Sequence, residues 1–374
     1  MEFRDLKKQY QVLKTDIDAA MIKVATECNC ISGQQVSDLE NELAAYVGVK
    51  HCISCANGTD ALSLAAIAWG WGPGDAIFVP DFTFFSSGEI VADEGATPIF
   101  VDVCENTFNM DPVSLENAIK VVISEGKLTP KGVVAVDLFG QPANFNEIIP
   151  ICKKYNLQLL EDGAQGFGGQ IGDKMACSFG DIATTSFFPA KPLGCYGDGG
   201  AVFTNDDELA SLMKSLSVHG KGSMKYDNVR IGMNSRLDTI QAAILLVKFN
   251  AFKGYEVTDV NKVATRYTEL LKNIVVTPTV LPDFISSWAQ YSILLKNKEQ
   301  RDGLQAFLKE NGVPSMIYYP KPMHKQQAFE NFDCVKVDLN ITSDICDRVL
   351  ALPLHPYMDE ESQVCSLIRK FMED

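Results

Sequence analysis

Short apolar runs alternate with amphipathic segments over the first 250 residues of the chain. The runs are rich in Val, Ile and Phe, and most end in a polar or glycine-containing turn, which is typical of strands buried on both faces. We expect strands at residues 51–55, 76–80, 97–103, 133–139, 157–162 and 199–205. Because helical segments separate the runs, the pattern predicts an α/β fold with a mostly parallel sheet, whose ligands gather at the carboxyl ends of the strands.

The segments between these runs have the apolar spacing of one helix face. Ser37-Asp38-Leu39-Glu40 has the form of a capping box, which predicts a helix that begins there and ends near Val47. A further helix is expected from Thr239 to about Phe249. Such helices suit the crossover connections that parallel strands need.

The character of the chain changes after residue 250. A charged helix at 259–271, a β segment at 288–295 and a helix near 300–312 indicate a smaller α+β unit. We therefore expect two domains: a large one over residues 1–250, which includes an N-terminal arm, and a small one over residues 251–374.

Composition and charge narrow the class of ligand. The chain has 374 residues, of which 46% are hydrophobic and 22% are charged, as in ordinary globular proteins. Its formal net charge of −15 argues against a nucleic acid or an acidic membrane as a partner, because both are polyanions. The N-terminus lacks the apolar core of a signal peptide, and no apolar run approaches the roughly 20 residues that span a bilayer. We therefore expect a cytoplasmic protein.

The cysteines favour free thiols over a disulfide framework, because there are 11 of them, an odd number, spread over the whole length. Cys52 and Cys55 form a CxxC pair without a second pair to complete a zinc site. The chain also contains only 4 histidines, so we expect no bound metal.

Aspartates stand at or near the ends of several predicted strands: Asp81, Asp102, Asp137 and Asp162. Asp162 differs from the others because a glycine-rich turn follows it, which leaves room for its carboxylate to be partly buried. A buried carboxylate needs a positive group beside it. The glycines after Asp162 are not a dinucleotide fingerprint, because Ile171 stands where the third glycine would be needed.

Lys191 lies on a stiff turn between Pro189 and Pro192, and the glycine-dense stretch 194–200 follows it. A stiff turn suits a side chain that must be aimed. A lysine forms a Schiff base only when its amine is neutral, which requires burial or a nearby positive charge. The alternative is a βα loop in which the lysine has no special role.

Two further stretches offer ligand-binding groups. Gly58 and Thr59 begin a helix, whose free N–H groups make an anion site or serve only as a cap. Residues 316–325 place tyrosines, a histidine and lysines between prolines, which suits a loop that closes over a ligand or an exposed connector.

Together these groups match the needs of pyridoxal phosphate. Its aldehyde needs an amine, its pyridine nitrogen needs a carboxylate, and its phosphate needs N–H and O–H donors. Lys191, Asp162 and the helix start supply these groups, with Ser186 as a further hydroxyl. The aromatic stretch 82–85 is the expected cover for the ring.

Five ordered blocks resemble the DegT/DnrJ/StrS sugar aminotransferases. The blocks are Asn57-Gly58-Thr59-Asp60-Ala61-Leu62, Glu161-Asp162-Gly163-Ala164-Gln165, Ser186-Phe187-Phe188-Pro189-Ala190-Lys191, Gly197-Asp198-Gly199-Gly200-Ala201 and Asn234-Ser235-Arg236-Leu237-Asp238. The resemblance implies a type I, aspartate aminotransferase-like fold and a homodimer with shared active sites. It also implies pyridoxal phosphate and pyridoxamine phosphate as cofactors, bound by the large domain, and amino transfer from glutamate to a keto nucleotide sugar. The blocks are most similar to enzymes that aminate the 3-oxo position of UDP-N-acetylated uronic acids for lipopolysaccharide O-antigens.

The resemblance also implies roles for single residues. The catalytic residues would be Lys191, as the Schiff-base lysine, and Asp162, at the pyridine nitrogen. The other cofactor-binding residues would be Gly58, Thr59 and Ser186 at the phosphate, Gln165 at the phenolic oxygen, Phe84 against the ring, and Asn234 at the phosphate of the other subunit. The substrate-binding residues would be Arg236, Tyr318, Tyr319 and His324.

Two departures from the family pattern bear on function. Similar enzymes have a His-Tyr pair where this chain has Tyr318-Tyr319, which leaves the sugar open. Gly163 replaces the usual alanine and loosens the turn without removing a functional atom. Family members that dehydrate sugars replace the lysine by histidine, so Lys191 favours amino transfer over the dehydratase alternative. A cofactor-binding regulatory protein without turnover is the remaining alternative.

Overall fold

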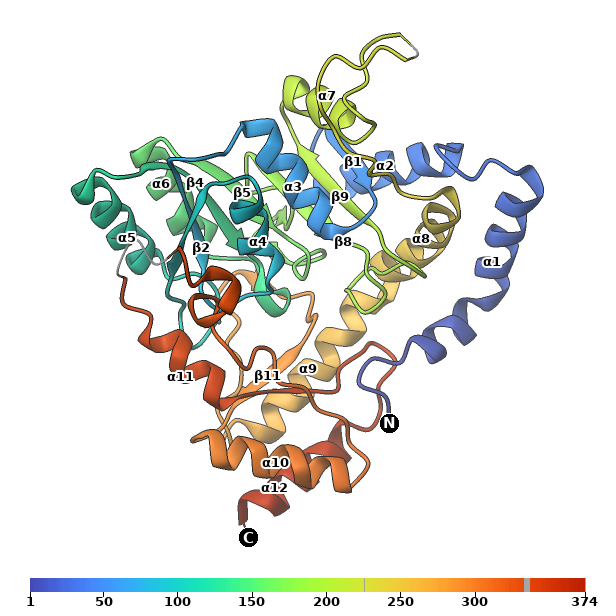
Figure 1. The fold of residues 1–374 in the computed structure, drawn as a ribbon. Coiled ribbons are helices and arrows are strands. Elements are labelled where there is room, and N and C mark those ends of the chain that lie inside the picture. Colours follow the sequence, from blue (N-terminus) through green and yellow to red (C-terminus); the bar gives the residue numbers. More distant parts are fainter. Residues whose placement is uncertain (225, 333–336, 374) are drawn as a thin grey trace.

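The computed structural model describes residues 1–224, 226–332 and 337–373. At its centre is a seven-stranded sheet (Figure 1). Its strands, in spatial order, are β1 (His51–Cys55), β9 (Gly200–Thr204), β8 (Ile182–Ser186), β5 (Gln158–Asp162), β4 (Thr129–Val136), β2 (Asp75–Pro80) and β3 (Thr97–Val101). Only β9 runs against the others in this sheet, because it pairs antiparallel with both β1 and β8. The predicted α/β fold with a mostly parallel sheet is confirmed.

Two element boundaries differ from the prediction. The strand expected at 133–139 ends at Val136, because Leu138–Gly140 turns as a 3-10 helix. The capping-box interpretation of Ser37 is wrong, since α2 (Gln34–Val47) begins before it, after Gly33. The Ser37 hydroxyl instead donates to the Gln34 carbonyl, at 2.9 Å, within the helix.

Helices cover both faces of the sheet. One face packs against α3 (Gly58–Trp69), α4 (Ser86–Asp93) and α7 (Asp207–Leu216). The other packs against α2, α5 (Pro112–Glu125), α6 (Phe145–Tyr155) and α8 (Thr239–Ala251). Successive strand side chains alternate between the two layers, so that Val79 and Phe78 lie in different cores. The carboxyl ends of β2, β4 and β5 therefore lie between the two helical layers.

A continuous helical run leads out of the large domain. α8 passes through the π-helical segment Phe252–Glu256 into α9 (Val257–Leu271), which descends diagonally in Figure 1. The domain boundary predicted at residues 250/251 lies inside this run and stays a prediction. α9 and the elements that follow it share a second hydrophobic core. Its other members are β11 (Tyr291–Leu294) paired with β12 (Val349–Leu352), α10 (Lys298–Glu310) and α12 (Glu361–Glu373). α11 (Asn340–Arg348) instead buries Ile345 and Cys346 in the core beneath α3, α4 and α7.

The N-terminal arm links the two ends of the chain. Asp5 caps α1 (Leu6–Glu27) by accepting from the Lys8 N–H at 2.8 Å, and α1 packs along α8. The Phe3 carbonyl accepts from Leu354 N at 3.2 Å, so the chain begins against the C-terminal elements (Figure 1). Over the described residues, no helix combines the length and apolarity needed to cross a bilayer.

Candidate active site

Asp162 is the last residue of β5, in the middle of the sheet between β4 and β8. Its side chain is only 4% exposed. Ser87 Oγ donates to Oδ2 at 2.8 Å, and Ala164 N donates to Oδ1 at 3.2 Å. Burial raises the pKa of Asp162, whereas these hydrogen bonds and the charge of Lys191 act in the opposite direction. The positive group expected beside this carboxylate is thus Lys191.

Lys191 is held on a tight turn after β8. Its N–H donates to the Phe188 carbonyl at 2.8 Å. The chain then folds back so closely that a Cβ on Gly194 would lie 2.5 Å from the Pro189 oxygen. This close approach explains why a glycine follows the proline pair.

The electrostatics around Lys191 favour a neutral amine. Burial lowers its pKa, and the nearby charge of Arg4 lowers it further, while Asp162 opposes the shift. A second lysine, Lys248, lies behind the turn, where its ammonium donates to the Gly194 carbonyl. Burial lowers the pKa of Lys248 to about 8. Arg4 and Lys248 are not predictable from the sequence, because neither lies at the end of a predicted strand.

The start of α3 meets the end of β8. Asn57 caps the helix by accepting from Asp60 N at 2.8 Å, which leaves the N–H groups of Gly58 and Thr59 directed out of the first turn. A Cβ on Gly58 would lie 2.7 Å from the Cβ of Ser186, so only glycine fits beside this hydroxyl. The structure thus brings together the three residues predicted to bind the phosphate.

Gln165 and Tyr319 join the large domain to the loop from the small one. Gln165 accepts from the Phe139 N–H at 2.9 Å and donates from Nε2 to the Tyr319 hydroxyl at 3.2 Å. Burial raises the pKa of Tyr319. Phe84 is 53% exposed, with its ring centroid 6.4 Å from that of Tyr319, whereas Phe82 is buried in the core. Within the aromatic stretch, Phe84 is therefore freer than Phe82 to cover a ligand.

The block around Arg236 is anchored beside α3 of the same chain. Ser235 Oγ donates to Asp60 Oδ2 at 2.6 Å and accepts from Ala56 N at 3.0 Å. Arg236 donates to the side chain of Asn234, which is exposed. Arg236 also lines a hollow of about 960 Å³, together with His219, Lys221 and Arg230. Contact of Asn234 with the phosphate of another subunit stays a prediction.

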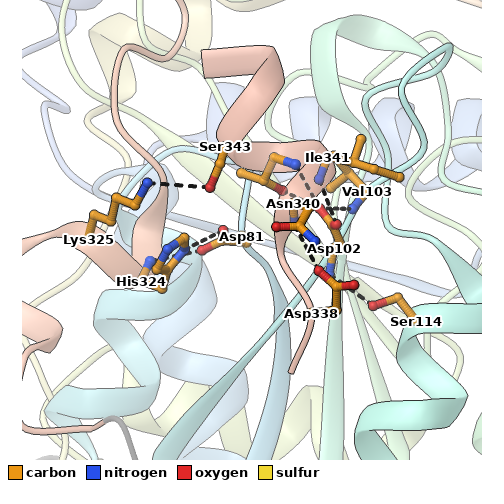
Figure 2. Close-up of polar contacts among 11 residues, drawn as sticks. Asp81, Asp102, Val103, Ser114, His324, Lys325, Asp338, Asn340, Ile341 and Ser343 are labelled. Atoms are coloured by element: carbon orange, nitrogen blue, oxygen red, sulfur yellow. Dashed lines mark hydrogen bonds and ion pairs between the residues drawn. The ribbon is translucent and has the colours of Figure 1, made fainter. Parts of the chain in front are cut away.

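His324 contacts the large domain through Asp81 (Figure 2). Asp81, after β2, is fully buried and accepts from His324 N at 2.8 Å, and its second oxygen lies 2.6 Å from His324 Nδ1. Asp102, after β3, accepts from Ile341 N at 2.9 Å and from Thr342 N at 2.8 Å at the start of α11 (Figure 2). These strand-end aspartates attach His324 and the start of α11 to the central sheet, and the predicted sugar contact of His324 stays a prediction.

Asp137 forms a buried carboxyl pair with Glu161 beneath the site. Glu161 accepts from Phe179 N at 2.7 Å and Gly180 N at 3.1 Å, and Asp137 accepts from Ala143 N at 2.9 Å. Burial raises the pKa of Asp137 well above its ordinary value and that of Glu161 to about 7. These upward shifts favour retention of a proton by the pair. The N–H of Asp137 also donates to the Asp162 carbonyl at 3.0 Å, so Asp137 supports the end of β5.

Known proteins resemble this chain over almost its whole length. The model of the DegT/DnrJ/EryC1/StrS aminotransferase family matches residues 11–369. The chain belongs to this family. It is 44% identical, over 97% of both chains, to a UDP-2-acetamido-2-deoxy-3-oxo-D-glucuronate aminotransferase from Pseudomonas aeruginosa. It is also 40% identical, over 96% of this chain and 94% of the relative, to a pleiotropic regulatory protein from Geobacillus stearothermophilus.

Solved structures of family members have the same fold. A DegT/DnrJ/EryC1/StrS aminotransferase from Brucella abortus superposes with a TM-score of 0.97, at 46% identity and full coverage of both chains. NtdA from Bacillus subtilis, with the cofactor PMP bound, superposes with a TM-score of 0.86, at 28% identity over 97% of this chain and 82% of that one. The family and the type I fold that the sequence blocks predict are confirmed.

Proposed function

We propose that this aminotransferase moves an amino group from glutamate to the 3-oxo carbon of a UDP-linked acetamido sugar acid. The observation that carries the proposal is the 44% identity, over 97% of both chains, to the Pseudomonas aeruginosa enzyme of that activity. The polar site around Lys191 and Asp162 supports the class of reaction. We further propose a cytoplasmic homodimer that supplies an O-antigen precursor.

The residues present fit pyridoxal phosphate, the cofactor on which this aminotransferase depends. Gly58 leaves open a space beside Ser186 that any larger residue would fill. In the part of the chain that the structure describes, Lys191 Nζ has no hydrogen-bond acceptor, so its amine is available for a covalent bond. Asp162 is fixed by Ser87 and faces the same region. When bound, the cofactor supplies an electron-withdrawing ring that stabilises the charge left when a carbon beside nitrogen loses a proton.

The chain's own groups would bind and orient this ring. Asp162 would accept a hydrogen bond from the protonated pyridine nitrogen. Gln165 would donate to the phenolic oxygen, and Phe84 would lie against the ring face. The N–H groups at Gly58 and Thr59 would hold the phosphate, since a helix start favours anions. Arg236, Tyr318 and Tyr319 would contact the sugar, with Asn234 completing the phosphate site of the partner subunit.

Lys191 would carry the proton in both halves of the reaction. Its neutral Nζ would remove the proton from the α-carbon of glutamate in the first half and would deliver a proton to the sugar carbon in the second. A positioned general base of this kind contributes about 10²–10⁴ in rate. Burial and the charge of Arg4 both lower the pKa of Lys191, which favours the neutral amine that this role requires.

One experiment identifies the acceptor. The protein is loaded with pyridoxamine phosphate and mixed with 3-oxo and 4-oxo sugars, each linked to UDP or dTDP, while the absorbance of the aldehyde form of the cofactor is followed. We expect the UDP-linked 3-oxo sugar acid to restore that absorbance fastest. Faster recovery with a 4-oxo or dTDP-linked sugar would contradict the proposed substrate.

A regulatory role is the second candidate, because one relative at 40% identity has a regulatory name. Addition of glutamate to the pyridoxal phosphate form distinguishes the two. Full spectral conversion within seconds to minutes indicates turnover. No change with any amino donor would favour the regulatory role and contradict amino transfer.

A further inference from the structure

Arg4 is a charged side chain that lowers the pKa of the active-site lysine and also has a free hydrogen-bonding edge. Its Nη2 donates to the carbonyl of Pro192, the residue after Lys191, at 3.3 Å. The flanking backbone fixes this position, because Phe3 is bonded to Leu354 and Asp5 caps α1. The arm therefore holds one guanidinium at the edge of the site.

This guanidinium has unused hydrogen-bonding capacity. It carries five N–H donors, and the Pro192 carbonyl is its only acceptor among the described residues. Over the same residues, Arg4 forms no ion pair within 4.0 Å. Glu256 is near enough to act on its charge, but its carboxylate accepts from Gln9 Nε2 at 2.7 Å and the Tyr357 hydroxyl at 2.6 Å. A partly buried cation without an anion is unfavourable, so a bound anion would complete this site.

The residues around Arg4 contact residues of the candidate active site. The ring of Phe3 lies 6.2 Å from that of Tyr318, whose neighbour Tyr319 bonds to Gln165. Arg4 also acts electrostatically on Lys191. An anion bound at the guanidinium therefore lies near the reacting amine and within the region that both substrates must enter.

We propose that Arg4 binds a carboxylate of a substrate and so positions that substrate beside Lys191. A carboxylate is the anion that a planar guanidinium matches through two parallel hydrogen bonds. The inference rests on the proposed function, in which glutamate and the sugar acid each carry a carboxylate. The carboxylate on Arg4 therefore comes from glutamate or from the sugar acid, and the two half-reactions distinguish these two substrates.

Binding to the holoenzyme tests the inference without turnover. Calorimetry measures the Kd of glutarate for the pyridoxal phosphate form, and the Kd values of UDP-N-acetylglucosaminuronate and UDP-N-acetylglucosamine for the pyridoxamine phosphate form. We compare wild type, Arg4→Gln, Arg4→Lys and the control Lys7→Gln, which removes an exposed charge from the same arm. Melting temperatures confirm that each variant is folded.

We expect Arg4→Gln to weaken one carboxylate ligand by about 10–100-fold, the loss typical of a charged hydrogen bond. Arg4→Lys should lose less, and Lys7→Gln should change nothing. Weaker glutarate binding assigns the amino donor, whereas weaker binding of the uronate but not of the neutral sugar assigns the acceptor. Unchanged Kd values, or equal losses for the charged and the neutral sugar, would overturn the inference.

The half-reactions separate this inference from the proposed function. If glutamate and a keto sugar convert the cofactor at the same rates in wild type and in Arg4→Gln, the proposed role of Arg4 alone is overturned. Wild type that converts with neither substrate overturns the proposed function itself.

Discussion

Two sets of strand-end aspartates have opposite roles in this molecule. Asp162 ends β5 in the centre of the sheet, where Ser87 and the neighbouring Lys191 keep it in a ligand site. Asp81 and Asp102 follow β2 and β3, the last two strands on one side of the sheet, where His324 and the first turn of α11 occupy their oxygens. The same local pattern thus forms the proposed cofactor site or a packing contact, depending on which element crosses the end of the strand.

The largest expected effect is on Asp162. Asp162→Asn keeps the hydrogen bond from Ser87 but removes the charge that would hold a proton on the ring nitrogen. We expect kcat to fall by about 10²–10³-fold, comparable to the loss of one electrostatic catalytic contact, with little change in Tm. Steady-state kinetics and thermal melting check this. If kcat of Asp162→Asn stays within a few-fold of wild type, Asp162 does not differ in role from Asp81 and Asp102.

His324→Ala should act mainly on stability. It leaves the buried Asp81 carboxylate without its side-chain partner, which costs about 2 kcal/mol for a hydrogen bond to a charged group. Urea unfolding measures this loss, and sugar KM measures any contact with substrate. If KM rises by tenfold or more at unchanged stability, His324 binds the sugar and the docking interpretation of Asp81 is wrong.

Asp102→Ala should have a smaller effect of the same kind. Asp102 caps α11 from the other domain, and loss of a cap costs about 1 kcal/mol. We expect a lower urea midpoint and an unchanged kcat. Asp338 is exposed beside the same helix and, among the described residues, accepts only from Asn340 N, at 3.2 Å, so a matched Asp338→Ala variant should change less. A large loss of kcat in Asp102→Ala would place this aspartate with Asp162.

The last expected effect is on the pH dependence of stability, through Asp137 and Glu161. Burial raises their pKa values in the folded state, that of Glu161 to about 7, so the folded protein binds more protons than the unfolded chain. Their contribution to stability is therefore present at low pH and is lost as pH rises from about 5 through 7, by at most about 1.4 kcal/mol per pH unit for each proton that the folded protein retains.

Asp137→Asn mimics the protonated partner and should flatten this slope. Melting curves between pH 5 and 8 for wild type and Asp137→Asn measure the change. Equal slopes in the two proteins would show that the pair does not hold the proton.

Much of this site is accessible from local sequence, and the rest is not. An apolar run followed by a carboxylate, or a lysine between prolines, is a local signal, so Asp162 and Lys191 were predictable. The role of Asp81 was not, because it depends on His324, which is distant in sequence and lies across the end of β2. Arg4 carries no local signal, and only the docking of the N-terminal arm against Leu354 places it beside Lys191. Strand order and domain docking are long-range properties that a local pattern does not encode.

The most direct test of the central claim is to find which lysine carries the cofactor. Borohydride reduction of the pyridoxal phosphate form makes the bond to lysine permanent, and peptide mass mapping locates it. Among the described residues, Lys191 and Lys248 are the lysines with lowered pKa values, so Lys248 is a competitor for the cofactor. We expect the adduct on Lys191 alone, and none in Lys191→Ala. An adduct on Lys248, or one that persists in Lys191→Ala, would contradict the account.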